Sequence, residues 1–348
     1  MAWLWLLFSR LLGGAAQAGI FPCSAVIVAE WFPSDRRAFA SGWLAASMQV
    51  GALIAFFLTG VFLDWMDWRW VFVIFALPGF IWTIGFYRWF RDRPQDHRTV
   101  NAQEIRLIAN PEQHPIAAHS DDDRQQAITH DPTPWKRLAA SPAMWCICGQ
   151  QFFRAAGYIF YSTWFPTFLR ETRGVSVKES GYLTTLPILA ALLGALSGGT
   201  VSDWVLTRTG SRRLARQGVA VTGLSCCALC IFIAYLVHES IERPLPAVLL
   251  ISAGAFCASL AGPASYSTTI DMAGKHVATV FATMNMSGNI GAMVFPMVVP
   301  IILGETGAAG NWNQVLFMFC GIYVAAALCW LMLKPTGTFL DQSRIRES

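Results

Sequence analysis

The amino-acid sequence predicts an all-helical integral membrane protein. Of its 348 residues, 55% are hydrophobic and only 13% are charged, whereas a soluble domain usually carries about 25% charged residues. The stretches 42–63 and 246–264 are apolar on nearly every side and about 20 residues long, the length of a helix that crosses a bilayer. A soluble helical bundle would keep a polar face on each helix, so we set that alternative aside.

Nine apolar runs follow one another along the chain, and each is long enough to form a membrane helix. One long polar stretch interrupts them, with three runs before it and six after it. The expected spans are Trp3–Trp31, Ala38–Leu63, Trp70–Trp89, Met144–Leu169, Tyr182–Leu206, Val219–Val237, Leu245–Thr268, Val277–Leu303 and Val315–Leu333.

An internal repeat explains the unequal numbers of helices. Residues 38–52 (AFASGWLAASMQVGA) align with residues 278–292 (ATVFATMNMSGNIGA), so that Gln49 matches Asn289 and each segment is the penultimate helix of its half. Two parallel six-helix repeats joined by a long loop are typical of one large class of transporters. The sequence would then hold nine helices of an expected twelve. The expected domains are 1–90, three helices of a truncated N-terminal half; 91–137, a central loop; 138–335, a six-helix C-terminal half; and 336–348, a tail.

The basic residues predict the orientation of these helices. Outside the spans, most of the 25 lysines and arginines fall on the side of the central loop, and Lys/Arg-rich loops stay in the cytoplasm. We therefore expect a multi-pass protein of the plasma (inner) membrane with its central loop and C-terminus in the cytoplasm. The basic residues on the side opposite the central loop are Arg69, Arg170, Arg173, Lys178 and Arg243. The net charge of the whole chain, +4, is too small to indicate nucleic-acid binding.

The N-terminal segment has an alternative interpretation as a signal peptide. Ala16-Gln17-Ala18 resembles a small-residue cleavage site. However, no basic region precedes the apolar run, Arg10 interrupts it, and it continues through residues 19–29. We favour a membrane helix here.

The nine cysteines indicate packing rather than disulfides or a metal site. Nearly all lie inside apolar runs, where a thiol behaves as a small hydrophobe. Cys226, Cys227 and Cys230 share one helix, but no histidine or carboxylate accompanies them to complete a tetrahedral site. No nucleophile and base lie at a shared depth either, so the sequence does not favour an enzyme.

Two arginines carry most of the functional information. Arg10 and Arg154 are the only charged side chains well inside the expected spans. Arginine keeps its proton, so burying it is costly and usually marks the path of an ion or substrate. Two fixed positive charges without a carboxylate at that depth predict a site for an anion. The alternatives are that each arginine snorkels to the surface or pairs with a carboxylate on a helix that the sequence lacks.

Polar residues on neighbouring helices extend the predicted site. Tyr158 lies one helical turn after Arg154 and shares its face. Gln49, Asn285 and Asn289 carry amides that suit the oxygens of a small polar ligand, although such amides also form interhelical packing bonds. A break in the seventh expected helix is predicted at Gly262-Pro263.

A short motif follows the fifth expected helix. Gly199 and Asp203 lie at its end, followed by a basic turn with Arg208, Arg212 and Arg213. An acid at a helix end and a basic turn suit charges that latch neighbouring helices together. The motif resembles the signature between the second and third helices of each half in the major facilitator superfamily, and this resemblance implies a conformational role.

A second resemblance narrows the family. Arg10-Leu11-Leu12-Gly13, Phe21-Pro22, Trp31-Phe32-Pro33 and Arg37 are similar to the fourth helix and following loop of the anion:cation symporters. That branch includes hexuronate, galactonate and glucarate transporters and the vesicular glutamate and sialin transporters. It implies secondary transport of a small organic anion, with sugar acids as the expected class, by rocking of two halves around a site in mid-membrane.

The resemblance also implies roles for single residues. Phe153-Arg154 ahead of Trp164-Phe165-Pro166 is similar to the seventh-helix arginine of the vesicular glutamate transporters. Arg154 and Arg10 would hold the carboxylate, and Gln49, Asn285 and Asn289 would contact the hydroxyls. Gln17 occupies a position where many family members carry a glutamate that takes part in proton coupling, and Gln17 cannot titrate.

The expected partners are therefore the lipid bilayer and a small organic anion, with H⁺ or Na⁺ as co-transported ions and no other cofactor. We expect a monomer. Two further interpretations stay open: a transporter-like sensor that binds an organic anion without moving it, and an exporter of a drug or metabolite.

Overall fold

The computed structural model describes residues 2–108, 133–240, 244–304, 312–335 and 337–339. The predicted central loop is described only at its two ends, and most of the predicted tail lies outside the described residues. The described chain is helical, with short connections. Its longer helices are α1 (Ala2–Gln17), α2 (Ile20–Trp31), α3 (Arg37–Leu63), α4 (Trp68–Trp89), α5 (Ala102–Ile108), α7 (Trp135–Ala140), α8 (Pro142–Thr163), α9 (Phe165–Arg173), α10 (Val177–Thr209), α11 (Val219–Ser240), α12 (Pro244–Ala273), α13 (Val277–Leu303) and α14 (Trp312–Met332).

Local sequence explains where several helices begin and end. The Asp67 carboxylate accepts a hydrogen bond from the Arg69 backbone N–H, and the Ser176 hydroxyl accepts one from Glu179, so both residues cap helix N-termini. Helix α8 begins with Pro142, whose missing N–H costs nothing in the first turn. Helix α10 ends at Gly210, which has a φ of 65° that glycine adopts without strain. Three single turns complete the chain: η1 (Pro94–Asp96), the π-helical turn η2 (Arg213–Gly218) and η3 (Gly274–His276).

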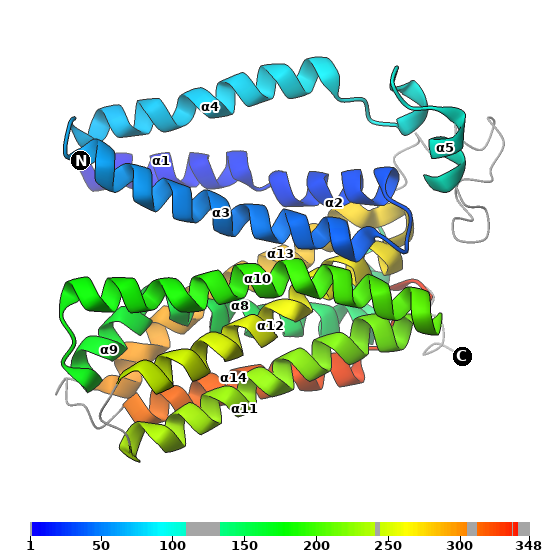
Figure 1. The fold of residues 1–348 in the computed structure, drawn as a ribbon. Helices are drawn as coiled ribbons and strands as arrows, with labels where there is room; N and C mark the ends of the chain where they lie inside the picture. Colours follow the sequence, from blue (N-terminus) through cyan, green and yellow to red (C-terminus); the bar gives the residue numbers. More distant parts are fainter. Residues whose placement is uncertain (1, 109–132, 241–243, 305–311, 336, 340–348) are drawn as a thin grey trace.

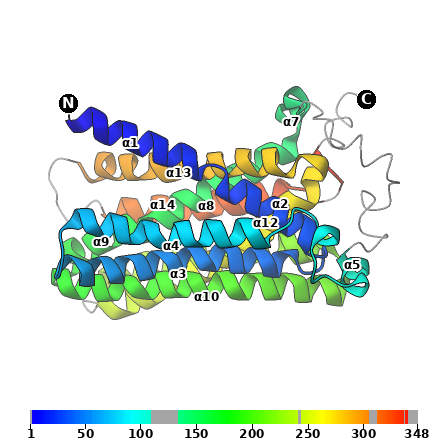
Figure 2. The same cartoon turned by 90° about the horizontal axis from the view of Figure 1, so that it is seen from above.

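The helices form two groups, α1 to α4 and α8 to α14 (Figures 1 and 2). Helices α8 and α10 to α14 pack into one bundle, whose core contains large aromatic side chains such as Phe160 and Phe319. Helices α2 and α3 pack against this bundle, α3 on α10 and α12, and α2 on α13. Helix α4 lies on the far side of α3 from the bundle and is largely exposed. The prediction of an all-helical fold is confirmed.

A described helix covers each of the nine expected spans, with two differences. The first span is divided into α1 and α2 at Ala18-Gly19, and the fourth into α8 and α9. The predicted break at Gly262-Pro263 is wrong, because α12 runs continuously through Pro263. Among the described residues, seven stretches are long and apolar enough to cross a membrane, and one of them, Pro244–Leu303, contains both α12 and α13. Helix α8 is not among the seven, because its glutamines and arginine make it more polar.

The two groups of helices contact each other most closely at one end. We call this the linker end, because α4 ends and α8 begins there. On α3, Ala38 and Ala46 are buried, whereas Leu63 at the opposite end is half exposed. The contact is close: a Cβ atom on Gly199 would lie 2.5 Å from the Ala38 carbonyl oxygen. At Gly51, farther along α3, a Cβ would meet nothing within 4 Å. The two groups therefore meet at the linker end and separate toward the opposite end.

Candidate functional site

Arg154 on α8 is half-buried and lies one helical turn before Tyr158, whose hydroxyl contacts the other group of helices. Its Nη2 donates a hydrogen bond to Gln151 Oε1 at 2.9 Å, and its guanidinium carbon is 5.9 Å from the centre of the Tyr266 ring on α12. A Cβ atom on Gly262 would lie 3.4 Å from Arg154 Nη1, so glycine leaves room beside the guanidinium. The Nε atom is buried and has no hydrogen-bond partner among the described residues.

Arg154 therefore offers donors that the described protein does not use. A guanidinium has five N–H donors in a planar fork that matches a carboxylate, and Gln151 is the only hydrogen-bond acceptor that the described residues place beside Arg154. Leaving a buried donor without a partner costs about 1–3 kcal/mol. An anion could accept hydrogen bonds from the N–H groups that Arg154 leaves unused.

Tyr158 and Gln49 complete the site from both groups of helices. The Tyr158 hydroxyl on α8 donates to Gln49 Oε1 on α3 at 2.7 Å. Both side chains are half-buried. The bond occupies the oxygen of Gln49 but leaves its NH₂ group as a donor, and the Tyr158 oxygen can still accept a hydrogen bond. We call Arg154, Gln151, Tyr158, Gln49 and Tyr266 the Arg154 site.

The structure does not bring the other predicted site residues into this cluster. Arg10 and Gln17 are exposed on α1. Asn285 on α13 is half-buried, and Asn289 is exposed. Among the described residues, none of these four side chains forms a hydrogen bond to the Arg154 site. Their proposed contacts with substrate stay predictions.

The sequence did not single out two members of the Arg154 site. Gln151 could have been found from the sequence. Paired amides at positions 150 and 151 are unusual inside an apolar run, and position 151 lies one turn before Arg154. Nothing in the sequence indicated Tyr266, because its position beside Arg154 depends on how α12 crosses α8.

The Gly199–Asp203 motif lies at the linker end and connects the two groups of helices. Asp203 Oδ1 accepts a hydrogen bond from Arg216 Nη1 at 2.7 Å, and Oδ2 accepts one from the backbone N–H of Phe39 at 2.6 Å. Phe39 is in the first turn of α3, whose own N-cap residue makes no side-chain cap. Asp203 thus supplies a carboxylate to the positive end of a helix in the other group.

A second ion pair lies beside the first. Arg37 Nη1 on α3 is 2.6 Å from Asp271 Oδ1 on α12, and Arg37 Nη2 donates to the Ala29 carbonyl oxygen at 3.0 Å. The side chains of this pair are 6% and 10% exposed, and those of Arg216 and Asp203 are 1% and 10% exposed. We call Asp203, Arg216, Arg37 and Asp271 the linker-end lock.

The basic partner of Asp203 is therefore not one of the predicted arginines. Arg208 is exposed and lies over the Trp204 ring at 5.8 Å, and Arg212 is also exposed. Arg213 Nε donates to Gln217. The π-helical turn η2 explains the difference, because it buries the successive residues Ala215, Arg216 and Gln217. Such a turn leaves no simple pattern in the sequence.

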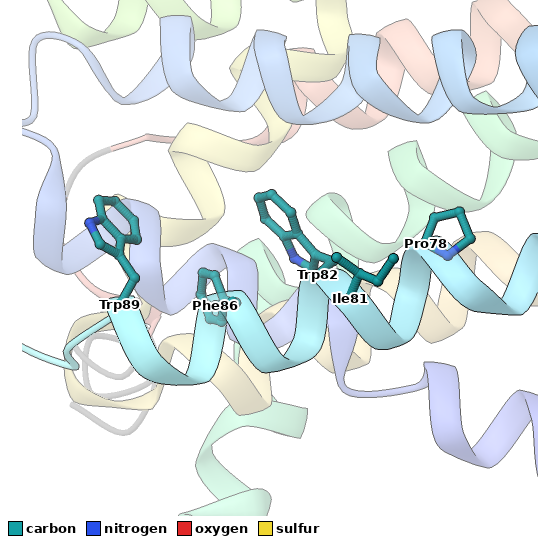
Figure 3. A pocket seen from close by; sticks show the side chains of 6 residues that line it. Pro78, Ile81, Trp82, Phe86 and Trp89 are labelled. Carbon is teal, nitrogen blue, oxygen red and sulfur yellow. The ribbon is translucent and has the colours of Figure 1, made fainter.

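A groove of about 600 Å³ runs along α4 (Figure 3). It lies on one helix, contains no residue of the Arg154 site and has no charged side chain. A ligand site normally adds polar groups that orient the ligand, so this groove is not the candidate site. Its lining residues are Pro78, Ile81, Trp82, Gly85, Phe86 and Trp89.

Comparison with known proteins places the chain among transporters. It is 30% identical over 334 residues to a probable sulfoacetate transporter of Cupriavidus necator, covering 96% of this chain and 73% of that protein. It is 30% identical to a probable galactarate/D-glucarate transporter of Escherichia coli (strain K12), covering 93% and 70%. A D-galactonate transporter of E. coli O6:H1 is 25% identical, covering 93% and 73%.

The fold is also similar to that of a solved transporter structure. The proton:xylose symporter XylE bound to 6-bromo-6-deoxy-D-glucose superposes with a TM-score of 0.63 over 93% of this chain and 70% of that one, at 16% sequence identity. Residues 1–241 match the sequence model of the Major Facilitator Superfamily. The family suggested by the sequence motifs is thus confirmed, and the chain belongs to the Major Facilitator Superfamily.

Proposed function

We propose that this protein is a secondary transporter that moves a small organic anion across the membrane by alternating access. The observation that carries the proposal is Arg154, a permanently charged guanidinium with unused donors at the boundary between the two groups of helices. A fixed charge in that position is costly unless an anion visits it. The transporter names of the relatives support the same conclusion.

The substrate that fits best is a sugar acid. Its carboxylate would accept hydrogen bonds from the unused N–H groups of Arg154. Its hydroxyl groups would accept from the Gln49 NH₂ group and donate to the Tyr158 oxygen, both of which the Tyr158–Gln49 bond leaves available. Relatives named for galactarate, D-glucarate and D-galactonate support this class of substrate. Arg10, Asn285 and Asn289 are further candidates for contacts in other states of the cycle.

We place the linker end in the cytoplasm, because most basic residues outside the helices lie there. The protein would then be an inner-membrane monomer with a cytoplasmic C-terminus. Contact at the linker end and separation at the opposite end correspond to a state that receives the anion from outside. Release into the cytoplasm requires the linker-end lock to open. The contacts that must break between the two groups of helices are the Arg37–Asp271 ion pair and the hydrogen bond from the Phe39 backbone N–H to Asp203.

Transport of an anion into a cell also needs a source of energy. Moving one negative charge inward against a membrane potential of 100 mV costs about 2.3 kcal/mol. Co-transport of H⁺ or Na⁺ would cancel that charge. Gln17 cannot carry the proton, so a coupled cation would bind elsewhere.

The test is uptake into proteoliposomes. Radiolabelled D-galactonate, D-glucarate and a hexuronate would be offered with an inward H⁺ or Na⁺ gradient. We expect gradient-stimulated uptake of at least one acid and its loss in Arg154→Ala. The matched control is Arg106→Ala, which removes an exposed arginine on α5. Uptake by Arg154→Ala at the wild-type rate would contradict the site, and binding without uptake in any gradient would favour the sensor.

A further inference from the structure

A second polar cluster lies inside the bundle, behind the Arg154 site. Gln150 is completely buried, at 0% exposure. Its Nε2 donates to Ser265 Oγ at 2.6 Å and to the Ile147 carbonyl oxygen at 2.9 Å, and its Oε1 accepts from the Trp330 indole N–H at 3.2 Å. One side chain therefore connects α8, α12 and α14, and all its hydrogen-bonding groups are used.

The position of this cluster relates it to Arg154. Gln150 precedes Gln151, the hydrogen-bond partner of Arg154, and Ser265 precedes Tyr266, the ring beside its guanidinium. The bond between Gln150 and Ser265 thus joins the two helices whose side chains lie beside the guanidinium of Arg154. It fixes their spacing and rotation within hydrogen-bonding tolerance, which an apolar contact would not do.

Trp330 is itself held from the linker end. Gln217 Nε2 donates to the carbonyl oxygens of Trp330 and Leu331 at 2.7 and 3.0 Å, and Gln217 Oε1 accepts from Arg213 Nε at 2.9 Å. The amide adds a side-chain donor to carbonyl groups in the last turn of α14, where helical partners run out; the Trp330 carbonyl also accepts from the Leu333 backbone N–H at 3.2 Å. It therefore fixes the end of α14 and the indole that reaches Gln150.

We propose that Gln150 is a positioning residue of the anion site, with Trp330 as its support. It holds α8 against α12 so that Arg154 keeps its open N–H groups toward the ligand. This inference rests on the proposed function. Gln150 does not touch the anion and acts only through the orientation of Arg154.

The experiment measures D-galactonate and D-glucarate affinity by calorimetry on the purified protein in lipid nanodiscs. Gln150→Leu removes the amide at nearly constant volume, and Trp330→Phe removes the indole N–H from the same cluster. The matched control is Ser287→Ala, because the Ser287 hydroxyl donates to the Cys148 carbonyl at 2.8 Å and also ties α8 to a neighbour, but toward α13.

We expect Gln150→Leu and Trp330→Phe to raise the dissociation constant about 10-fold, the effect of losing one hydrogen bond to a charged group. Ser287→Ala should stay within about 2-fold. The Arg154→Lys background distinguishes a positioning role from a general structural role, because lysine lacks the planar fork that Gln150 would orient. If Gln150 acts through Arg154, adding Gln150→Leu to Arg154→Lys should weaken binding by less than about 2-fold.

Three results would overturn the inference. Wild-type affinity in both Gln150→Leu and Trp330→Phe, together with loss of binding in Arg154→Ala, would refute the positioning role alone. A full 10-fold effect of Gln150→Leu in the Arg154→Lys background would show a general structural role. Wild-type affinity in Arg154→Ala would overturn the proposed function, and the positioning role with it. If Gln150→Leu does not fold, Trp330→Phe alone decides.

Discussion

The Arg154 site and the linker-end lock both place arginines between the same two groups of helices, yet they differ in how those arginines are satisfied. In the lock, Arg37 and Arg216 each face a carboxylate and backbone carbonyl oxygens of the chain. In the site, Arg154 has only neutral neighbours, the Gln151 oxygen and the Tyr266 ring. An unpartnered Nε does not separate the two, because Arg154 and Arg216 both have one among the described residues. The difference lies in the carboxylate: an arginine paired with an acid of the chain holds a conformation, whereas one without an acid leaves its charge for an anionic ligand.

The largest effect on stability is expected in the lock. Arg216→Leu would leave the buried Asp203 carboxylate without its cation, and breaking a buried ion pair from one side costs about 3–5 kcal/mol. Unfolding of the protein in detergent micelles measures this loss. Adding Asp203→Asn should recover part of it, because the uncompensated charge is then removed. No recovery in the double variant would contradict the pairing.

Arg154→Leu should weaken anion binding strongly and change the stability of the protein little. Loss of two charge-assisted hydrogen bonds at about 1.5 kcal/mol each predicts roughly a 150-fold rise in the dissociation constant for the anion. The free energy of unfolding should change by less than about 1 kcal/mol, because no ion pair is broken. Calorimetry and unfolding of the same preparation measure both quantities. Destabilisation as large as that of Arg216→Leu would remove the distinction between site and lock.

Gly199→Ala tests the close contact beside the lock. The new Cβ would lie 2.5 Å from the Ala38 carbonyl oxygen, so α3 and α10 must separate at a cost of about 1–3 kcal/mol. Cysteines placed at the linker end should become more reactive toward a membrane-impermeant maleimide. Gly51→Ala on α3 is the control, because its Cβ would meet nothing within 4 Å.

The smallest effect is expected for Tyr158→Phe. It removes the bond to Gln49 between the two groups of helices, worth about 0.5–1.5 kcal/mol. The affinity for the acid should fall by about 2- to 10-fold, measured by calorimetry. Tyr182→Phe, which alters an exposed tyrosine on α10, should leave affinity unchanged. Equal effects of the two variants would exclude a specific role for Tyr158.

The sequence predicted the fold because long apolar runs have few alternatives. The helix ends and the divisions at Ala18-Gly19 and within 144–169 were missed, and the break predicted at Gly262-Pro263 was wrong. It predicted Arg154, Tyr158 and Gln49 because polar groups in apolar runs are conspicuous, and the structure places these three together. Their role in binding stays a prediction.

The pairings within the linker-end lock could not be predicted from the sequence. Arg37 and Asp271 lie at helix ends, where charged residues are ordinary, and their pairing depends on the packing of α3 against α12. Arg216 is one of several arginines in a basic turn, and only the π-helical geometry of η2 selects it. Three-dimensional packing, rather than local pattern, decides these contacts.

The polarity of α8 has a consequence for the biogenesis of the protein. An arginine at the centre of a newly inserted helix costs about 2.5–3.5 kcal/mol, and α8 also carries two glutamines. The ribosome makes α8 before α12 and α14, which supply Ser265 and Trp330. We therefore expect α8 to remain unstable in the bilayer until α12 and α14 have been synthesised and have packed against it.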